Sequence, residues 1–485
     1  MASTSNENQV ACFLNSADEA AKTILETVKA DGFIHVFSHL DADGVAAAGI
    51  IGKALFRLDA RFRIRITQWI EQKIVGEILS DKPQLVIFTD LGSGYVDLLS
   101  QKLADFKIAI LDHHQIIGKE SANFVHVNPH LYGIDGARDV SGAGVAYFVA
   151  HALDKVNVDL APIAVVGALG DMQDKYDQRM LGGLNGRILG DARNSGLLTV
   201  EKDLIFFGRE TRPIHKTLAS TTSPFIPGIS GEEDKSLAFL ASLGIKPREG
   251  DKWRALRDLS EEEKKRLCSA LADHLLSKGL RYEVSNLIGH VYILNREEPW
   301  TPLRDAREFA VLLNATGRMD KPGLGIAVCM GDRGQGLEGA NKVLDDYRRT
   351  LNKYLGWVME KPERVKEFEN IYVVSGEGFI DDKIIGAISS ILSGSLPNPE
   401  KPLIAYSNVE GEDIAKISAR ASDTVTSRGL NLGEIMQAAA EKFLGKGGGH
   451  NVAAGAQVPI EDIDNFIKTV NELVGKQLKG ERSGS

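Results

Sequence analysis

Residues 37–44, FSHLDADG, bring an imidazole and two carboxylates together directly after an apolar run. His39, Asp41 and Asp43 could bind a divalent cation or transfer protons, because imidazole nitrogens and carboxylate oxygens do both. The segment alone is more typical of a polar turn, since it lacks the third Asp and the distal Glu of a calcium loop. Its chemistry therefore depends on whether similar residues lie beside it.

Similar residues follow three other apolar runs. Asp90 ends LVIFTD, the DHH of IAILDHH is Asp112, His113 and His114, and Asp171 follows VVGALG. Separately these would be a helix cap, a pair of core or surface histidines and a loop acid. Together they are expected to converge, because the carboxyl ends of neighbouring parallel strands form the crevice where ligands bind.

So many carboxylates in one crevice would repel one another and lose hydration unless a cation lay among them. A mixed carboxylate and imidazole set around a shared Asp suits two Mn²⁺ or Mg²⁺ ions about 3.5–4 Å apart, an arrangement used in phosphoester hydrolysis. We therefore expect two divalent metal ions, Mn²⁺ or Mg²⁺, as cofactors.

The elements that position these residues are visible as a repeating pattern. From residue 33 to about 130, short β-rich runs alternate with helix-sized segments, which predicts βαβ units around a parallel sheet. Helices are also predicted over 143–154 and 161–170, where the early Pro162 and the alanines favour a helix over a buried strand. The expected strands are FIHVF, RFRIRI, LVIFT, KIAIL and NFVHV.

The pattern changes between about 225 and 360. A turn-rich stretch, SPFIPGISG, precedes a capped amphipathic helix, LSEEEKKRLCSALADHLLSKG, and a long helix, GANKVLDDYRRTLNKYLGWVME. A second α/β pattern runs from NIYVVSG through LIAYSN, AKISARAS and the helix NLGEIMQAAAEKFL to GKGGGHNVAAGA. We expect domains at 1–220, 221–362 and 363–476, with a polar tail at 477–485.

Bulk properties exclude several protein classes. The 485 residues are 43% hydrophobic, enough for several cores. Cys12, Cys268 and Cys329 form no C-x-x-C pair, so we expect a cytoplasmic protein without a zinc knuckle or disulfide framework. The polar N-terminus and the absence of an apolar run of about 18 residues indicate no membrane partner. A net charge of -9 argues against coating nucleic acid by bulk electrostatics, but not against a local basic groove.

The ordered set H-x-D-x-D-G, D, DHH and GD, with a distal GGGH, resembles the DHH phosphoesterases that carry a C-terminal DHHA1 domain, most closely the archaeal RecJ-like exonucleases. The N-terminal motifs span 37–171, and LLNATGRM at 312–319 is similar to the INAxGR segment of RecJ nucleases. The resemblance implies an α/β chain: an N-terminal DHH domain with a parallel sheet flanked by helices, a helical insert or linker region, and a smaller C-terminal α/β DHHA1 domain.

The resemblance also implies roles at matching positions. Asp41 and Asp90 would hold the first metal, and Asp90 would bridge to a second metal held by Asp43, His113 and Asp171.

His114 would contact the scissile phosphate, and Asp112 would orient the histidine pair from behind. The chain departs from the pattern at one position. Many relatives carry the first histidine four residues before the D-x-D pair, where this chain has Phe37, whereas His39 stands two residues before it. Whether His39 binds the first metal is therefore left open.

Two segments could hold a polyanionic substrate. The strand period of two places Ser418 and Arg420 of ISARAS on one face, where both could bind a phosphate. The triple glycine would let the backbone approach a phosphate or base, with His450 as a donor, although alone it is more typical of a flexible loop. The resemblance implies that both segments hold the nucleotide. The glycines are Gly447, Gly448 and Gly449.

Arg318 and Asn314 are weaker substrate candidates, because NATGRM could serve only as a structural turn.

These observations favour a metal-dependent phosphodiesterase, an exonuclease acting on single-stranded DNA or RNA in replication, repair or RNA turnover. One alternative is a small-substrate phosphodiesterase that hydrolyses short oligonucleotides or cyclic dinucleotides. Another is a replisome scaffold, since a eukaryotic helicase cofactor of the family has a degraded site and archaeal RecJ-like proteins can associate with GINS. The complete set of carboxylates favours an enzyme; GINS stays a candidate partner.

Overall fold

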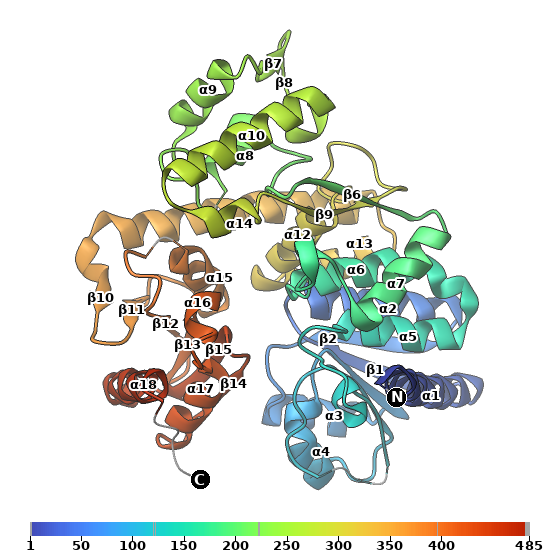
Figure 1. Ribbon diagram of the computed structural model, residues 1–485. Helices are drawn as coiled ribbons and strands as arrows, with labels where there is room; N and C mark the ends of the chain where they lie inside the picture. The colour runs from blue at the N-terminus through green and yellow to red at the C-terminus, as the bar shows by residue number, and fades with distance from the viewer. Residues whose placement is uncertain (1, 120, 122, 222–223, 395, 481–485) are drawn as a thin grey trace. The chain divides into compact units, whose positions relative to one another are not determined.

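The computed structural model describes residues 2–119, 121, 123–221, 224–394 and 396–480. Part of the expected polar tail, residues 481–485, lies outside this set. The chain divides into two compact units, Met1–Leu344 and Asp345–Ser485, whose elements are labelled in Figure 1. The division expected from the sequence, at 220/221 and 362/363, stays a proposal.

A five-stranded parallel sheet forms the centre of the first unit, as the sequence predicts. Its strand order is β2-β1-β3-β4-β5. The central strands are buried almost throughout because helices cover both faces, whereas the edge strand β2 alternates exposed arginines with half-buried apolar residues. The bounds are Phe33–Ser38 (β1), Arg61–Ile66 (β2), Leu85–Thr89 (β3), Ile108–Leu111 (β4) and Phe124–Val127 (β5).

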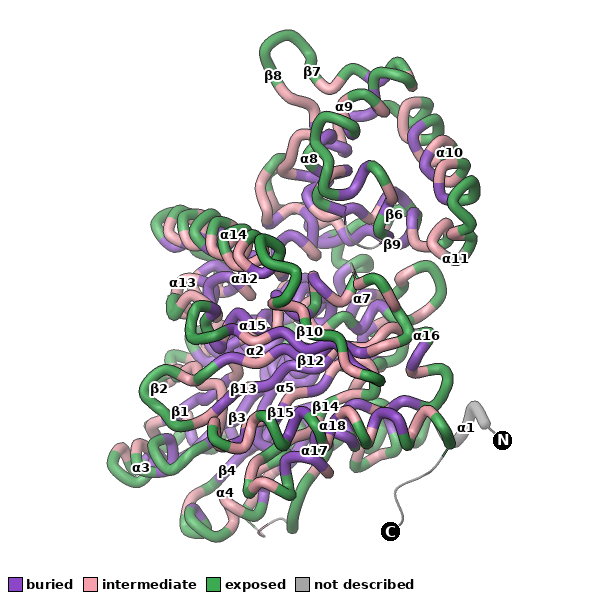
Figure 2. Tube along the Cα trace, turned by 90° about the vertical axis from the view of Figure 1, so that its left-hand side faces the viewer, coloured by how far each residue is buried: buried purple, intermediate pink, exposed green. Residues whose placement is uncertain are grey.

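Helices pack on both faces of this sheet. On one face α3 (Gln72–Asp81) and α4 (Val96–Lys102) share an apolar cluster with the strands. On the other, α2 (Ala42–Arg57) and α5 (Gly142–Leu153) contact β3, and Figure 2 shows both helices as largely buried. A further helix, α6 (Ala161–Gly170), packs on α2 and α5, which confirms the helix predicted there.

Other helices complete this part of the unit. They are α1 (Ala2–Lys29), which packs on α5, and α7 (Gly183–Asn194), which packs on α6.

The middle region is an insertion between two paired strands. β6 (Leu198–Leu204) pairs antiparallel with β9 (Ile288–Leu294), so the chain leaves and returns at one ladder. Between them α10 (Glu261–Ser277) starts at a capping box formed by Ser260 and Glu263, as predicted, and buries a leucine stripe in a separate core. The other elements are α8 (Ile214–Ala219), α9 (Glu233–Ser242), β7 (Arg248–Glu249), β8 (Lys252–Trp253) and α11 (Arg281–Val284).

After the insertion the chain returns to the sheet-bearing core. α12 (Ala306–Arg318) and α13 (Pro322–Cys329) both contact α2, and α12 also contacts α6. The reading of NATGRM as only a turn is wrong, because Asn314 to Arg318 form the last turns of α12. The next helix, α14 (Gln335–Glu360), contains the boundary between the units.

The second unit is a mixed sheet with helices on both faces. Its order is β10-β11-β12-β13-β15-β14, with only β11 and β12 parallel. α15 (Asp382–Ser393) contacts β12 and β13. On the opposite face of the sheet, α17 (Leu432–Glu441) and α18 (Ile463–Leu478) share an apolar core with every second residue of the strands. The remaining bounds are β10 (Val365–Glu367), β11 (Tyr372–Ser375), β12 (Leu403–Asn408), β13 (Ile414–Arg420), α16 (Asp423–Thr426), β14 (Lys446–Gly449) and β15 (Ala453–Pro459).

Within the described residues, every helix is too short or too polar to cross a membrane.

Candidate metal centre

The residues that follow β1, β3 and β4 meet at the carboxyl ends of these three adjacent strands. Nε2 of His113 lies 3.2 Å from Oδ1 of Asp90. It also lies 3.8 Å from Asp43 and 3.9 Å from Asp171, which ends α6. The second imidazole approaches the other Asp90 oxygen: Nδ1 of His39 lies 3.8 Å from Oδ2. Asp90 therefore lies between two groups of ligand atoms, one near each of its oxygens.

The two groups have compositions typical of metal sites. One consists of His39, Asp41 and Asp90, and in the other the donor atoms of Asp43, His113 and Asp171 lie within 4.8 Å of one another. Asp41 contacts Nδ1 of His39 at 3.0 Å and also caps α2 by accepting the N–H of Gly44. The helix-cap role and a ligand role can therefore coexist.

Local backbone geometry aims these carboxylates. Asp90 has φ of 56°, a left-handed conformation that turns the chain sharply at the strand end. Asp43 accepts hydrogen bonds from the N–H groups of Gly142 (2.6 Å) and Ala143 (3.0 Å) at the start of α5. A Cβ on Gly142 would lie 2.5 Å from Asp90 Cβ, so the SGAG segment can reach both aspartates only because glycine stands there.

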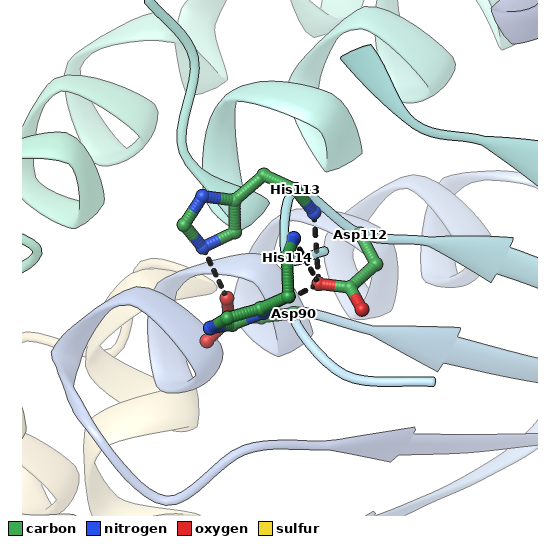
Figure 3. A group of neighbouring side chains, drawn as sticks. All are labelled: Asp90, Asp112, His113 and His114. Atoms are coloured by element: carbon green, nitrogen blue, oxygen red, sulfur yellow. Dashed lines mark hydrogen bonds and ion pairs between the residues drawn. The ribbon is translucent and has the colours of Figure 1, made fainter. Parts of the chain in front are cut away.

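The histidine pair is oriented by hydrogen bonds on its far side. Nδ1 of His113 donates to the carbonyl oxygen of Gly136 at 2.7 Å, which directs Nε2 toward Asp90. Asp112 accepts from Nδ1 of His114 at 2.8 Å and from the backbone N–H groups of His113 and Ser93. Figure 3 shows the His113 ring directed at Asp90 while Asp112 binds the backbone of the pair.

Burial and mutual repulsion perturb the charges of the centre. Burial, together with Asp171 and Asp41, raises the pKa of Asp43 to about 6 despite the nearby His113. Burial and the charges of Asp43 and Asp41 also raise the pKa of Asp90 well above its ordinary value. Both carboxyls lose stability as anions because nearby negative charge is not fully balanced. A bound cation would remove that cost.

His114 behaves differently. Partial loss of hydration lowers the pKa of His114, but the charge and hydrogen bond of Asp112 raise it to about 9. The His114 side chain keeps 47% exposure, so a protonated imidazole is presented to solvent beside the acidic cluster.

The donor set fits divalent cations. Nδ1 of His39 and Oδ1 of Asp90 are buried, and each lies near a group of the same cluster, 3.0 Å from Asp41 and 3.2 Å from His113. These imidazole and carboxylate atoms therefore face one another, as ligand atoms around a shared cation do. Carboxylate oxygens with one or two imidazoles are the ligands of Mn²⁺ and Mg²⁺ chemistry.

A further three-residue group lies on the α3 side of the sheet and is already neutralised. His35 lies 3.6 Å from Glu77 and 3.3 Å from Asp81. Arg63 contacts the same two carboxylates at 3.3 and 3.1 Å, and Arg65 lies 3.8 Å from Glu77. Two arginines thus balance the two acids, and this group is an ion-pair network rather than a competing metal site.

The last turns of α12 hold the loop that carries Asp41. Oδ1 of Asn314 accepts the N–H of Ala42 at 2.9 Å. A Cβ on Gly317 would lie 1.6 Å from the Leu40 carbonyl oxygen, so this close approach requires glycine. The sequence pointed to this segment only through INAxGR, which named Asn314 and Arg318 but not Gly317.

Arg318 acts on Asp41 electrostatically. Burial raises the pKa of Asp41, but His39 and the Gly44 N–H lower it below its ordinary value. The Arg318 guanidinium acts in the same direction.

Sequence reasoning missed Gln173. Its side-chain N–H₂ donates to Asp171 at 2.8 Å and to the Gly136 carbonyl at 2.9 Å, the same carbonyl that orients His113. Asn185 in turn donates to its amide oxygen at 2.7 Å. Its position two residues after Asp171 was the available signal.

The candidate substrate residues belong to the second unit. Ser418 and Arg420 lie on the same face of β13, as the period predicts, and both face α15: Ser418 contacts Oγ of Ser389 at 2.8 Å and Nε of Arg420 donates to Ser390 at 2.7 Å. Across the sheet Ser418 pairs with Gly455, and Gly455 pairs with Gly448.

The triple glycine forms strand β14, so the flexible-loop reading is wrong. A Cβ on Gly447 would lie 2.3 Å from the Met436 carbonyl oxygen, which shows that this glycine lets the strand pack against α17. A Cβ on Gly448 would meet no described heavy atom within 4 Å, and Gly449 has φ of 133°. The backbone N–H of His450 donates to Ala453 at 2.8 Å.

Three family models match the chain: a DHH-CID domain at residues 206–288, a DHHA1 domain at 369–476 and the DHH family, N-terminal domain at 33–168. An uncharacterized protein of Methanocaldococcus jannaschii is 33% identical over 475 residues, which cover 96% of this chain and 99% of that protein.

Solved structures share the fold at low identity. RecJ of Thermus thermophilus, in complex with Mn²⁺, matches with a TM-score of 0.58 and 16% identity over 95% of this chain. This chain spans only 55% of the length of that RecJ. CDC45 of Entamoeba histolytica matches with a TM-score of 0.63 and 13% identity, covering 95% of this chain and 99% of its own.

The DHH motif stands at the end of β4, the DHH and DHHA1 models match on either side of the insertion, and one relative is 33% identical over nearly the whole length of both chains. This chain therefore belongs to the DHH family and carries a DHHA1 domain.

Proposed function

We propose that this protein is a metal-dependent phosphodiesterase that removes nucleotides from an end of single-stranded DNA or RNA. The observation that carries the proposal is the position of Asp90, whose two oxygens face two separate groups of metal-ligand atoms. A shared carboxylate between two such groups suits a two-metal phosphodiesterase.

The residues would hold two divalent ions, Mn²⁺ in the first instance and Mg²⁺ as the alternative. Asp41, Asp90 and His39 would bind the first; Asp90 would also bind the second, with Asp43, His113 and Asp171. When bound, the ions would lower the pKa of water and neutralise charge on the phosphate.

Other side chains would position the substrate. His114, protonated at neutral pH because of Asp112, would donate to a phosphate oxygen. Arg318, beside Asp41, would add a second cationic donor.

The second unit would hold the strand. Ser418 and Arg420 would bind a phosphate, and the open backbone at Gly448 would contact the nucleotide. Gly447, Gly449 and His450 would shape the backbone at this edge of the sheet, where β14 lies. We propose that the enzyme acts in the cytoplasm, in replication, repair or RNA turnover.

An alternative is a scaffold of the replicative helicase that binds GINS, an archaeal arrangement. The fold likeness to CDC45 favours it, whereas the intact carboxylate set favours an enzyme. Failure to co-purify with GINS at moderate salt would count against this partner.

The test is digestion of 5′- and 3′-labelled single-stranded DNA and RNA of about 20 nucleotides, longer than the roughly 4–16 that one binding surface covers. Wild-type protein with Mn²⁺ should give a mononucleotide ladder, and Asp43→Asn should give none. Asp105→Asn, an exposed aspartate outside the centre, is the control and should digest normally. Cleavage only of dinucleotides would indicate a small-substrate phosphodiesterase, and no cleavage would favour the scaffold.

A further inference from the structure

A cavity of about 240 Å³ lies at the other ends of the two helices that carry metal-ligand candidates. α2 begins beside Asp43 and reaches the cavity with Lys53 and Arg57, while α6 begins at the cavity and ends at Asp171. At 1.5 Å per helical residue, Lys53 lies about 15 Å along α2 from Asp43. The cavity is therefore separate from the metal centre.

The residues that line this cavity carry an excess of positive charge. Arg57 forms two hydrogen bonds with Asp159, at 2.6 and 2.8 Å, and Arg333 forms two with Glu297. These two pairs are neutral and held in fixed, bidentate geometry. Two further cations line the cavity, Lys53 and Arg296, and neither forms an ion pair within the described part of the chain.

Nζ of Lys53 lies 5.7 Å from the centroid of the Phe56 ring, a cation–π distance. The four cations thus face two carboxylates and leave a surplus of two positive charges, in a protein whose net charge is -9. Such a surplus in a concave site attracts anions and matches the charge of a phosphate monoester dianion.

Apolar residues also line the cavity. Among them are Leu160, Ile163 and Met330, so the site joins apolar surface to a small number of charges, the combination that small-molecule sites show.

We propose that this cavity binds a small phosphate monoester, such as a nucleoside monophosphate. The phosphate would lie between Lys53 and Arg296, and the organic part would pack on Leu160, Ile163 and Met330. Because the site uses none of the metal-ligand candidates, the proposal goes beyond the proposed hydrolysis and does not depend on it.

Calorimetry on the full-length protein, freed of metal with EDTA, tests this without interference from the metal centre. The probes are adenosine monophosphate, inorganic phosphate and adenosine. We expect the monophosphate to bind, inorganic phosphate to bind more weakly, and adenosine to give no heat. Charge-assisted contacts to phosphate are strong, so Lys53→Met with Arg296→Gln should weaken binding by about tenfold for each cation removed.

The matched control removes one lysine and one arginine elsewhere, Lys468→Met with Arg193→Gln, both exposed; its affinity should equal that of the wild type. If the double variant melts early, Arg296→Gln alone repeats the test at an exposed position. Three results would overturn the proposal: no binding of either phosphate probe up to about 5 mM, a range that detects Kd values near 1 mM; unchanged affinity in both variants; or adenosine and inorganic phosphate each binding as tightly as the monophosphate.

Discussion

The side-chain oxygen of Asn314 accepts a hydrogen bond of 2.9 Å from the backbone N–H of Ala42, joining α12 to the first turn of α2 across 272 positions of sequence. Ala42 lies between Asp41 and Asp43, so this bond fixes the turn from which both carboxylates project. The position of the metal centre therefore depends on a helix that follows the insertion.

Asn314→Ala should weaken metal binding. The substitution leaves the N–H of Ala42 without its partner, at a cost of about 1–3 kcal/mol, and frees the turn that carries Asp41. Titration of Mn²⁺ by calorimetry should show a raised dissociation constant. Asn194→Ala, at an exposed position on α7, is the control. An unchanged Mn²⁺ affinity in Asn314→Ala would separate α12 from the metal centre.

Gly317→Ala should destabilise the first unit. The added Cβ would meet the Leu40 carbonyl oxygen. The backbone shift that this overpacking forces should lower the free energy of unfolding by about 1–3 kcal/mol or more. Gly323→Ala in α13 adds the same methyl group into open space and should be neutral or stabilising by up to about 1 kcal/mol. Urea unfolding of both variants measures the contrast, and equal midpoints would contradict the close approach of α12 to Leu40.

Asp43→Asn should remove a pH dependence from the stability of the metal-free protein, and with Mn²⁺ it should lower the melting temperature. The pKa of Asp43 is raised to about 6, so the folded, metal-free protein keeps this proton while the unfolded chain loses it near pH 4. The stabilising contribution of the wild-type carboxyl is thus lost as pH rises from about 4 to 6. Asparagine has no proton to lose.

In EDTA, the melting temperature of the wild type should therefore fall relative to that of Asp43→Asn as pH rises from about 4 to 7. The amide also replaces an oxygen that accepts a backbone N–H, but that cost is the same at both pH values. With Mn²⁺ at pH 7 the wild type should melt higher, because only the carboxylate binds the ion. Scanning calorimetry at both pH values measures this, with Asp105→Asn as the control. A melting-temperature difference that does not change between about pH 4 and pH 7 in EDTA would refute the assignment.

Asp112→Asn should shift the titration of His114. The Asp112 carboxylate raises the pKa of His114 to about 9, so removing its charge should move the imidazole toward its ordinary value of about 6.5. Imidazole NMR on metal-free protein gives the midpoint directly. Hydrolysis at pH 8 should fall relative to pH 6, because His114 would then be neutral. A midpoint that stays near 9 would mean that another group holds the proton.

Two glycines of β14 should have different roles, Gly447 in packing and Gly448 in substrate contact. Gly448→Ala meets no described heavy atom, so the variant should keep wild-type stability while its Michaelis constant for single-stranded substrate rises. Gly447→Ala would press on the Met436 carbonyl and should lower the melting temperature. Melting curves and kinetics for both variants make the comparison. Wild-type substrate affinity in Gly448→Ala would remove this strand from the substrate site.

The sequence by itself determined most of the strands and helices around the metal centre and which polar residues follow them. Continuous apolar runs separated by helix-sized segments indicated β1, β3 and β4, because a strand buried on both faces reads as an unbroken apolar run. The early Pro162 and the alanines indicated α6. The polar residues that follow these strands had to meet, since parallel neighbours end at one edge.

Only the tertiary structure decided how the metal-ligand candidates divide into two groups and which other residues hold them in place. That Asp90 presents separate oxygens to His39 and His113 depends on its left-handed backbone, which no periodicity encodes. The turn that carries Asp41 is held by Asn314 and Gly317, and β14 is held against α17 by Gly447. A glycine leaves no side-chain pattern to read, and its role depends on which distant backbone approaches it; that approach is set by long-range packing rather than by local sequence.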